Sequence, residues 1–383
     1  MGITTVAVVF ALFAVIQSSA QEFESRAKRG FMMDAHTGTV LYSKDPDAPF
    51  PPASLAKLMT MEVVFNAIRK GELSLTDTFP VSENAWRTGG APSRTSTMFA
   101  ELGSSVPLED LIRGVIVQSA NDGCIIIAEA MDGSEEKFAR RMTERARELG
   151  LTKSVFKNST GLPADGQIVT ARELVQLSQH IWRTYPEFYK YYSELEFTWN
   201  KIRQFNRNPL LKMGIGADGL KTGFTEESGF AITGSAERDG LRLFVALGGM
   251  KSRKERAQEA RRALDWGMKA FERIPLYEAD EIVGEAKVFG GDKSRVVLKA
   301  KNPISILVPI ASRDRLKARI VYQGPVMAPV EAGTPVGHLR VWIGDKMSQE
   351  TELFAAEDIS VGSLHSRAFD AIEELLTGWL RQL

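Results

Sequence analysis

Four pairs of a serine and a lysine three residues apart each combine a potential nucleophile with a potential base. A serine hydroxyl attacks a carbonyl only when a base lies within hydrogen-bond reach, and positions i and i+3 of a helix share a face. The pairs are Ser25/Lys28, Ser54/Lys57, Ser134/Lys137 and Ser154/Lys157. The spacing alone is weak, so the surroundings of each pair must distinguish them.

The pair of Ser54 and Lys57 has surroundings that suit catalysis. It stands at the start of an apolar stretch over residues 54–69, which follows Pro51-Pro52 and predicts a buried, central helix. Burial lowers the pKa of a lysine, so its amine can act as a base. A helix N-terminus also offers N–H groups to a developing oxyanion. We therefore predict Ser54 as the nucleophile and Lys57 as its base.

The other three pairs have surroundings that suit structural roles. The pair at Ser25 lies in a charged segment, and the pair at Ser134 lies at a solvent-facing helix start, where a lysine stays protonated. The pair at Ser154 lies in a stretch that alternates like a strand, in which positions i and i+3 point to opposite sides. None of these three is predicted to be catalytic.

Two further motifs carry side chains that a serine acyl transfer needs. Ser119-Ala120-Asn121 follows an apolar helical stretch, and its hydroxyl could pass a proton to a leaving amine. Lys221-Thr222-Gly223 begins a possible edge strand, where a cation and a hydroxyl could hold a carboxylate. Taken singly, each is more often an ordinary helix surface or turn. A second Ser-x-Asn, at Ser82, is predicted to be a helix cap or loop serine.

The segments around these motifs predict an α+β domain. Hairpins are expected over 30–43 and over 229–248 around Asp239-Gly240. Helices are expected over 54–69, 107–117, 123–131, 134–150, 171–185 and 252–274. This order is typical of an antiparallel sheet flanked by helices.

The sequence changes in character after Pro275. Short strands are expected at 281–284, 294–298, 305–309, 318–322 and 339–343. They predict a small all-β domain. Residues 363–383 predict an amphipathic helix, with Phe369, Trp379 and leucines on its apolar face. With few basic residues, this helix is expected to bind a membrane surface through its apolar face, and packing on the β domain is the alternative.

The N-terminus predicts export. Residues 6–16 are apolar, and Ser18-Ser19-Ala20 has the small-x-small spacing that a signal peptidase recognises, so residues 1–20 are expected to be a signal peptide. An uncleaved anchor is the alternative, although the apolar run is shorter than the roughly 20 residues of a spanning helix. The single cysteine, Cys124, cannot form an internal disulfide and is expected to be a buried apolar residue.

Charge and histidine content disfavour other classes of protein. The 48 basic and 48 acidic side chains cancel, so no global field attracts nucleic acid. The four histidines are far apart and lack ligand spacing, so we expect no metal site and no cofactor. The G-x-S-x-G elbow of a Ser-His-Asp hydrolase does not occur in the sequence.

Together and in this order, the three motifs resemble the penicillin-binding protein and β-lactamase superfamily, whose marks are S-x-x-K, S-x-N and K-T-G. The wider match resembles the low-molecular-weight penicillin-binding proteins, the D-alanyl-D-alanine carboxypeptidase family of serine peptidases. It covers residues 30–274 most closely, in the stretches 52–60, 111–114, 118–122, 158–162 and 218–225. The resemblance implies a transpeptidase-like (β-lactamase-like) domain over 21–274, a small β-rich domain over 275–362 and a membrane-anchoring helix over 363–383.

The resemblance implies a role for each residue of the first two motifs. Ser54 would attack the carbonyl of a penultimate D-alanine, and Lys57 would take its proton. Ser119 and Asn121 would relay a proton and orient the substrate. The backbone N–H groups of Ser54 and Phe224 would form the oxyanion hole.

The remaining residues implied by the resemblance bind the substrate carboxylate. Lys221 and Thr222 would hold it, and Arg256 stands where the family carries a carboxylate-binding arginine. Arg207 is a weaker match. The chain departs from many relatives at Gln167-Ile168-Val169-Thr170, where they carry a histidine and a Ser-Thr pair.

The implied activity is removal of the terminal D-alanine from peptidoglycan pentapeptide stems. The resemblance places the enzyme at the periplasmic face of the inner membrane and makes β-lactams its inhibitors. Two alternatives stay open. A β-lactamase shares the nucleophile, but the sequence lacks the E-x-x-L-N motif that would carry a deacylating glutamate. A non-catalytic wall-binding scaffold would work through the β-rich domain and the C-terminal helix, and the three intact motifs argue against it.

Overall fold

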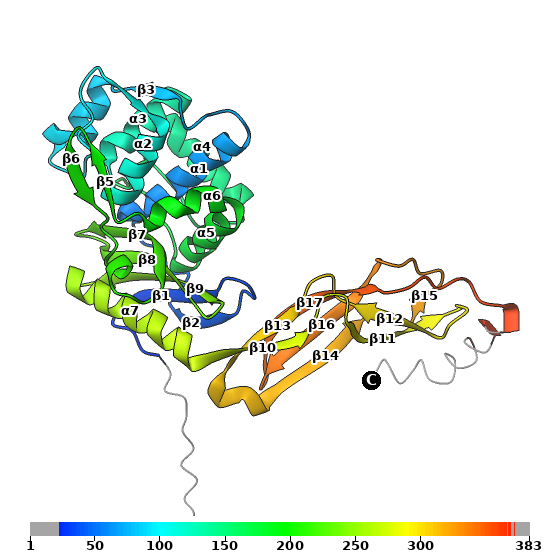
Figure 1. Ribbon diagram of the computed structural model, residues 1–383. Helices are drawn as coiled ribbons and strands as arrows, with labels where there is room; N and C mark the ends of the chain where they lie inside the picture. Colours follow the sequence, from blue (N-terminus) through cyan, green and yellow to red (C-terminus); the bar gives the residue numbers. More distant parts are fainter. Residues whose placement is uncertain (1–22, 366, 369–370, 372–383) are drawn as a thin grey trace, which may run out of the picture.

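The computed structural model describes residues 23–365, 367, 368 and 371. The predicted signal peptide over 1–20 and most of the predicted C-terminal helix therefore lie outside the described residues. Figure 1 shows a mixed region of helices and strands that ends with helix α7 (Arg253–Ala270), followed by an extended β-rich region. The predicted α+β class is confirmed for the first region.

A five-stranded antiparallel sheet runs through the first region in the order β2-β1-β9-β8-β7. Its strands are β1 (Arg29–Asp34), β2 (Val40–Lys44), β7 (Ala217–Thr225), β8 (Gly229–Arg238) and β9 (Leu241–Met250). Both predicted hairpins are confirmed, as β1–β2 and β8–β9. Strand β9 is central and all ten of its residues are buried, whereas β7 forms an edge.

Helices cover both faces of this sheet, α7 on one face and the others on the opposite face (Figure 1). The remaining α-helices are α1 (Lys57–Arg69), α2 (Leu108–Arg113), α3 (Asn121–Asp132), α4 (Glu135–Glu148), α5 (Ala171–Thr184) and α6 (Pro186–Tyr189). Short 3-10 or π turns are η1 (Ala53–Ala56), η2 (Ala85–Gly89), η3 (Ala91–Ser93), η4 (Gly114–Gln118), η5 (Lys190–Ser193) and η6 (Pro209–Lys212). Two small hairpins pair β3 (Thr78–Pro80) with β4 (Ser105–Pro107) and β5 (Glu196–Trp199) with β6 (Ile202–Phe205).

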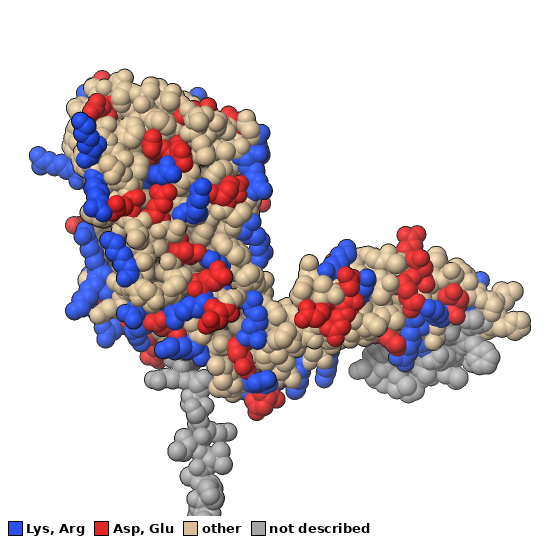
Figure 2. Space-filling model, in the orientation of Figure 1, with Lys and Arg blue, Asp and Glu red and all other residues tan. Residues whose placement is uncertain are grey.

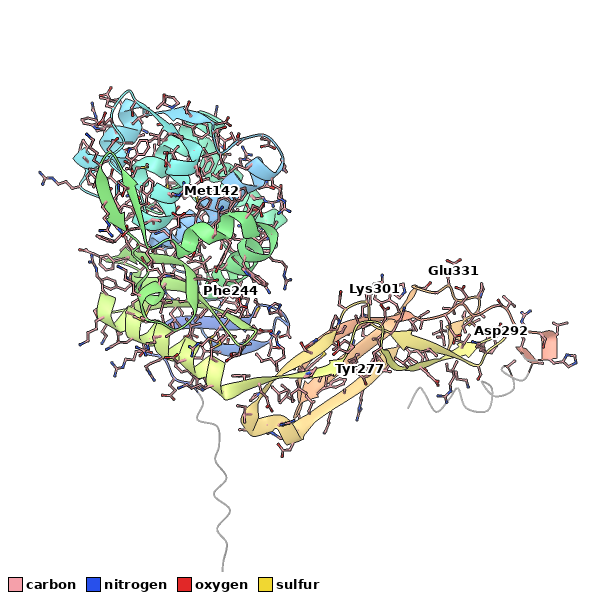
Figure 3. The ribbon with its side chains drawn as sticks, in the orientation of Figure 1. Met142, Phe244, Tyr277, Asp292, Lys301 and Glu331 are labelled. Carbon is pink, nitrogen blue, oxygen red and sulfur yellow. The ribbon has the colours of Figure 1, made fainter. Side chains whose placement is uncertain are left out.

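The alternation of side chains along β9 explains the two layers of core. Phe244 points into the cluster that packs the sheet against the helices, where Met142 of α4 also lies (Figure 3). Its neighbours Leu243 and Val245 point into the cluster that packs against α7. Successive strand residues face opposite sides, so a strand apolar on both faces must lie between two layers.

The β-rich region has its own core. A six-stranded sheet runs in the order β14-β16-β17-β12-β11-β15, and β10 pairs with β13 beside it. The strands are β10 (Phe271–Tyr277), β11 (Ile282–Phe289), β12 (Arg295–Lys299), β13 (Ile304–Pro309), β14 (Leu316–Tyr322), β15 (Val326–Met327), β16 (Pro335–Ile343) and β17 (Lys346–Ala355), with the 3-10 turn η7 (Ile310–Arg315). The predicted all-β character is confirmed.

Two expectations for this part of the chain are wrong. The helix expected over 252–274 ends at Ala270, because residues 271–274 pair with β13 as the start of strand β10. Strand β17 was not expected, because its sequence is largely polar and its place is set by pairing with β16. In both cases a partner strand distant in sequence outweighs the local pattern.

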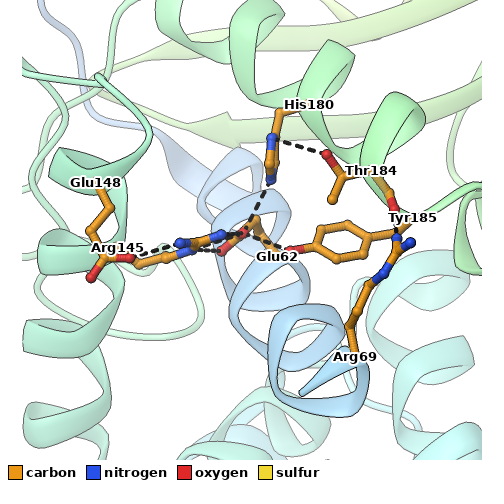
Figure 4. A network of polar contacts seen from close by, with 7 residues as sticks. All are labelled: Glu62, Arg69, Arg145, Glu148, His180, Thr184 and Tyr185. Carbon is orange, nitrogen blue, oxygen red and sulfur yellow. Dashed lines mark hydrogen bonds and ion pairs between the residues drawn. The ribbon is translucent and has the colours of Figure 1, made fainter. Parts of the chain in front are cut away.

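Helix α1 lies at the centre of the helical layer and carries a buried acid, Glu62. Its carboxylate accepts hydrogen bonds from Arg145 of α4 at 3.0 Å and from the hydroxyl of Tyr185 at 3.1 Å (Figure 4). His180 Nε2 of α5 lies 3.3 Å from the same carboxylate. The network fastens α1 to both neighbouring helices, since Arg145 comes from α4 while His180 and Tyr185 come from α5 and its C-terminal end.

Acidic and basic side chains are mixed over the surface of the molecule that Figure 2 shows, in keeping with their equal numbers. Within the described part of the chain, no helix combines the length and apolar composition needed to cross a membrane.

Candidate active site

The turn η1 and the start of α1 bring Ser54 and Lys57 together. A 3-10 helix has three residues per turn, so side chains three positions apart lie directly above one another. Lys57 Nζ donates a hydrogen bond of 3.2 Å to Ser54 Oγ. Ser54 is half-buried and Lys57 is buried. The hydroxyl is therefore open to a ligand while the amine is shielded from bulk water.

The amine of Lys57 has neutral partners. Nζ donates to the Asn121 side-chain oxygen at 2.8 Å and to the Thr160 carbonyl at 2.5 Å. Burial lowers the pKa of Lys57 to about 8. An amine with that pKa is neutral in about a tenth of the molecules at pH 7 and can accept a proton from Ser54.

Ser119 stands in the tight turn between the π-helical turn η4 and helix α3, and Asn121 is the first residue of α3. Ser119 has a left-handed backbone conformation, with φ at 65°, and its buried Oγ has no hydrogen-bond partner among the described residues. The orientation of the Asn121 amide is fixed by a second contact, because its side-chain nitrogen donates to Thr95 Oγ1 at 2.9 Å. Non-glycine residues in this backbone conformation often mark functional sites.

The edge strand β7 closes the other side of the site. A Cβ atom at Gly223 would come within 3.1 Å of the Pro52 carbonyl and 3.2 Å of Ala53 Cβ, so the glycine lets β7 lie against the turn that carries Ser54. Lys221 and Thr222 are buried at this contact. Burial and the neighbouring charge of Lys57 hold the pKa of Lys221 well below its usual value.

Two arginines extend this positive environment. Arg256 of α7 is buried, lies over the Phe230 ring at 5.7 Å, and leaves its Nε without a partner among the described residues. Arg207 donates to Ser96 Oγ at 2.5 Å. Burial lowers the pKa of Arg256 to about 10, and the charges of Arg253 and Arg207 add to this effect. Mutual repulsion among cations favours binding of an anion between them.

Phe224 follows the third motif and exposes half of its side chain. Its ring stacks on Phe230, with 4.2 Å between the centroids. The stack joins the end of β7 to β8 beside Arg256. The residues predicted for the site thus lie on η1 and the start of α1, at the turn into α3, on β7 and on α7, and Arg207 lies between β6 and η6.

Comparison with known proteins agrees with this arrangement. The family model described as D-alanyl-D-alanine carboxypeptidase matches residues 16–251, and the model of the penicillin-binding protein 5 C-terminal domain matches residues 271–361. The chain is 36% identical to D-alanyl-D-alanine carboxypeptidase DacC of Escherichia coli (strain K12), over 92% of this chain and 89% of the relative. The chain belongs to the D-alanyl-D-alanine carboxypeptidase family.

Solved structures support the same family. The crystal structure of penicillin-binding protein 5 from Haemophilus influenzae is similar with a TM-score of 0.81 and 34% identity, over 88% of this chain and 98% of that one. The structure of penicillin-binding protein 6B from Escherichia coli gives a TM-score of 0.71 at 32% identity, over 88% and 97% of the two chains. The predicted family, its fold and its serine peptidase class are thus confirmed.

The serines of the other three Ser-x-x-Lys pairs have structural partners. Ser25 Oγ donates to Glu259 at 2.9 Å, and Ser154 Oγ donates to Glu173 at 2.5 Å. Ser134 caps α4, accepting from the backbone N–H three residues on. Ser82 also behaves as predicted, accepting from the Ala85 N–H at 2.9 Å.

The prediction from sequence missed the loop over 158–161 as part of the carboxypeptidase site. Gly161 lies so close to η1 that a Cβ there would be 1.8 Å from the Ala53 carbonyl oxygen. The Thr160 carbonyl reaches Lys57 from this loop. The stretch 158–162 was part of the family resemblance, but side-chain types cannot show that a backbone carbonyl from it would contact Lys57.

The departure at residues 167–170 has a structural explanation. Gln167 is buried and fastens the same loop, accepting from the Asn158 N–H at 3.2 Å and donating to the Leu162 carbonyl at 2.9 Å. Thr170 caps α5.

In the described residues, no three His, Cys, Asp or Glu side chains are grouped as metal ligands would be.

Proposed function

We propose that this chain is a serine-type carboxypeptidase that removes the terminal D-alanine from peptidoglycan pentapeptide stems through an acyl-enzyme on Ser54. One observation carries the proposal: the Ser54 hydroxyl lies 3.2 Å from a buried amine whose pKa is lowered to about 8. That pair meets the two needs of a serine nucleophile, a base within reach and a base that can be neutral.

Acylation follows from the geometry of the pair. Lys57 Nζ accepts the hydroxyl proton as Ser54 Oγ bonds to the carbonyl carbon of the penultimate D-alanine. The N–H groups of Ser54 and Phe224 donate to the oxyanion that forms. Ser119, whose Oγ has no partner among the described residues, passes the proton that Lys57 took up to the departing amine, which leaves Lys57 neutral for deacylation. The C–N bond breaks and D-alanine leaves.

The substrate carboxylate binds among the cations. Lys221 and Arg256 supply positive charge, and Thr222 supplies a hydroxyl donor at the edge of β7. Arg207 is more exposed to solvent and donates to Ser96 Oγ. Binding of the carboxylate supplies the negative charge that this side of the site lacks, so it stabilises both the complex and the buried cations.

Deacylation returns the enzyme to its starting state. A water molecule attacks the ester carbonyl of the acyl-enzyme, and Lys57 accepts a proton from that water. The ester bond to Ser54 Oγ breaks, and the serine regains a proton. β-Lactams acylate the same oxygen through their ring amide, and their slow deacylation would make them inhibitors. Fast deacylation would instead make the enzyme a β-lactamase.

The test combines labelling and turnover. Wild-type protein and Ser54→Ala are incubated with a fluorescent penicillin, and D-alanine release from a pentapeptide is measured in parallel. We expect covalent labelling and D-alanine release from the wild type alone. Rapid penicillin turnover without D-alanine release would favour the β-lactamase. The absence of both reactions in wild type would favour the non-catalytic scaffold.

We further propose that the chain is exported through residues 1–20 and attaches to the periplasmic face of the inner membrane through residues 363–383. The apolar faces of those two segments in the sequence support this proposal. Truncation after Gly362 is expected to move the enzyme from washed membranes to the soluble fraction with activity retained. Persistence of the truncated protein in membranes would contradict it.

A further inference from the structure

Glu135, in the first turn of α4, holds the loop that contacts the predicted base. Its Oε1 accepts two hydrogen bonds from Ser159, one from the backbone N–H at 3.0 Å and one from Oγ at 2.6 Å. The next residue, Thr160, presents the carbonyl that accepts from Lys57 Nζ at 2.5 Å. A single peptide unit therefore separates the group held by Glu135 from the group that holds the amine.

Three successive peptide units of this loop each have a partner, and Glu135 is the partner of the first, which carries the Ser159 N–H. Thr60 of α1 donates to the Ser159 carbonyl at 2.7 Å, and Asn158 Oδ1 accepts from the Gly161 N–H at 2.7 Å. Gly161 itself lies against the Ala53 carbonyl. With these contacts in place, loss of the Glu135 contact frees the 158–159 peptide and the Ser159 side chain, and their movement reaches the Thr160 carbonyl through the one peptide unit between them.

We propose that Glu135 is a positioning residue for Lys57: its carboxylate fixes the Thr160 carbonyl and thereby sets where the amine of Lys57 lies relative to Ser54. This inference rests on the proposed function, in which Lys57 is the base. Glu135 lies outside all three sequence motifs. Its role is indirect, because its hydrogen bonds go to Ser159 and none joins it to the reacting atoms.

The charge of Glu135 gives the role a second, measurable consequence. Burial is the largest influence on the pKa of Lys57 and lowers it, and the negative charge of Glu135 opposes that lowering. The titratable and charged groups that face Lys57 are Cys124 and Asp122 of α3, Glu135 of α4, Lys221 of β7 and Arg207. Removal of the Glu135 charge should therefore move the pKa of Lys57 further down.

The experiment measures the acylation rate by fluorescent penicillin between pH 6 and pH 10 in Glu135→Gln, Glu135→Ala and wild type. In wild type the acidic limb should have its midpoint near pH 8, the pKa of Lys57. In Glu135→Gln the amide oxygen can still accept from Ser159, so we expect a small rate loss and a midpoint at lower pH. In Glu135→Ala the plateau rate should fall about 10- to 100-fold, because misplacement of a catalytic group by about 1 Å has effects of this size.

Two further variants separate the proposal from a general structural effect. Glu136→Gln is the matched control, since Glu136 is exposed on the same turn and pairs with Arg140 on the surface. It should leave rate and midpoint unchanged. Ser159→Ala removes one hydrogen bond to Glu135 without removing charge, so it should lower the rate a few-fold and leave the midpoint in place.

The outcomes are distinguishable from those that test the proposed function. Absence of Ser54-dependent labelling in wild type would contradict the proposed function itself. With wild-type labelling intact, an unchanged midpoint in Glu135→Gln, or a rate in Glu135→Ala equal to wild type, would overturn the role of Glu135. Thermal unfolding of each variant verifies folding, and Glu135→Gln carries the test if Glu135→Ala does not fold.

Discussion

Two buried polar clusters share helix α1 and differ in how their charges are balanced. Around Glu62, the carboxylate is paired with Arg145 and accepts from Tyr185 (Figure 4). Around Lys57, the amine donates to an amide oxygen and a carbonyl. Lys221 lies beside it, and its pKa is lowered by burial and by Lys57.

The difference separates a structural cluster from a reactive one. A buried charge with hydrogen-bonded partners of opposite charge holds elements together, and removal of one partner leaves the other uncompensated. Buried cations without carboxylate partners carry an electrostatic cost that an anionic ligand relieves. On one helix, therefore, the cluster around Glu62 should govern stability and the cluster around Lys57 should govern activity. Substitutions in either cluster test that division.

The largest expected effect is on activity, from Lys57→Met. A methionine fills a similar volume but has no basic amine, so acylation of Ser54 should fall by about 10³-fold or more. The free energy of unfolding should stay the same or rise, because a desolvated amine is replaced by an apolar group. Stopped-flow acylation and thermal unfolding measure the two quantities.

Lys137→Met is the matched control for that substitution, since Lys137 belongs to the Ser-x-x-Lys pair at the start of α4, where Ser134 acts as a cap. It should change neither quantity. A large loss of stability in Lys57→Met would show that the amine is part of the structural framework, contrary to the division between the clusters.

The next largest effect is on stability, from Glu62→Ala. We expect a loss of about 3 kcal/mol in the free energy of unfolding, because Arg145 and Tyr185 lose their buried partner. Glu144→Ala is the control, since Glu144 is exposed on α4. Denaturant unfolding measures both. A loss below about 0.5 kcal/mol, the size typical of surface substitutions, would contradict a structural role for Glu62.

The pH dependence of stability sharpens this prediction. Burial, the largest single influence, raises the pKa of Glu62, but the contacts with His180 and Arg145 outweigh it and the net pKa lies below the usual value. A carboxyl with a lowered pKa stabilises the fold above its unfolded pKa, and that contribution is lost as the pH falls through the folded value. Wild type should therefore lose stability on acidification below about pH 4.5 more steeply than Glu62→Gln.

A smaller effect on activity is expected from Arg256→Gln, which removes one of the buried cations that have no carboxylate partner in the reactive cluster. KM for a pentapeptide should rise about tenfold with little change in stability, because the guanidinium Nε has no partner among the described residues. Arg261→Gln, on the exposed side of the same helix and paired with Asp265, should leave KM unchanged. Steady-state kinetics at two salt concentrations would reveal the lost charge as a weaker salt dependence. An unchanged KM in Arg256→Gln would exclude this arginine from carboxylate binding.

The sequence predicted the reactive cluster better than the structural one. Ser54 and Lys57 were distinguishable because an apolar helix follows them, and local pattern reports burial. Glu62 gave no comparable signal, since its partners Arg145, His180 and Tyr185 are more than 80 residues away and only the packing of α4 and α5 on α1 joins them.

The same reasoning explains the other misses. The strand at Phe271 and the polar strand β17 depend on partner strands, and the Thr160 carbonyl depends on a loop conformation. Backbone groups have no sequence signature, so a site built partly from carbonyls is only partly predictable. The hairpin turns, caps and buried helix start were predictable because their chemistry is local.

Ser119→Ala is expected to change stability only slightly, and it is a sharp test of the division because its side chain belongs to the reactive cluster. The hydroxyl of Ser119 is buried without a partner among the described residues, so its removal should raise the free energy of unfolding by up to about 1 kcal/mol. The left-handed backbone conformation is retained by alanine at a similar cost, so it contributes little to the difference. Acylation should nevertheless fall about 10²-fold, because proton transfer to the leaving group loses its relay. A stabilised protein with impaired acylation would show that the unpaired hydroxyl is kept for reaction; a destabilised protein with normal acylation would assign Ser119 to the framework instead.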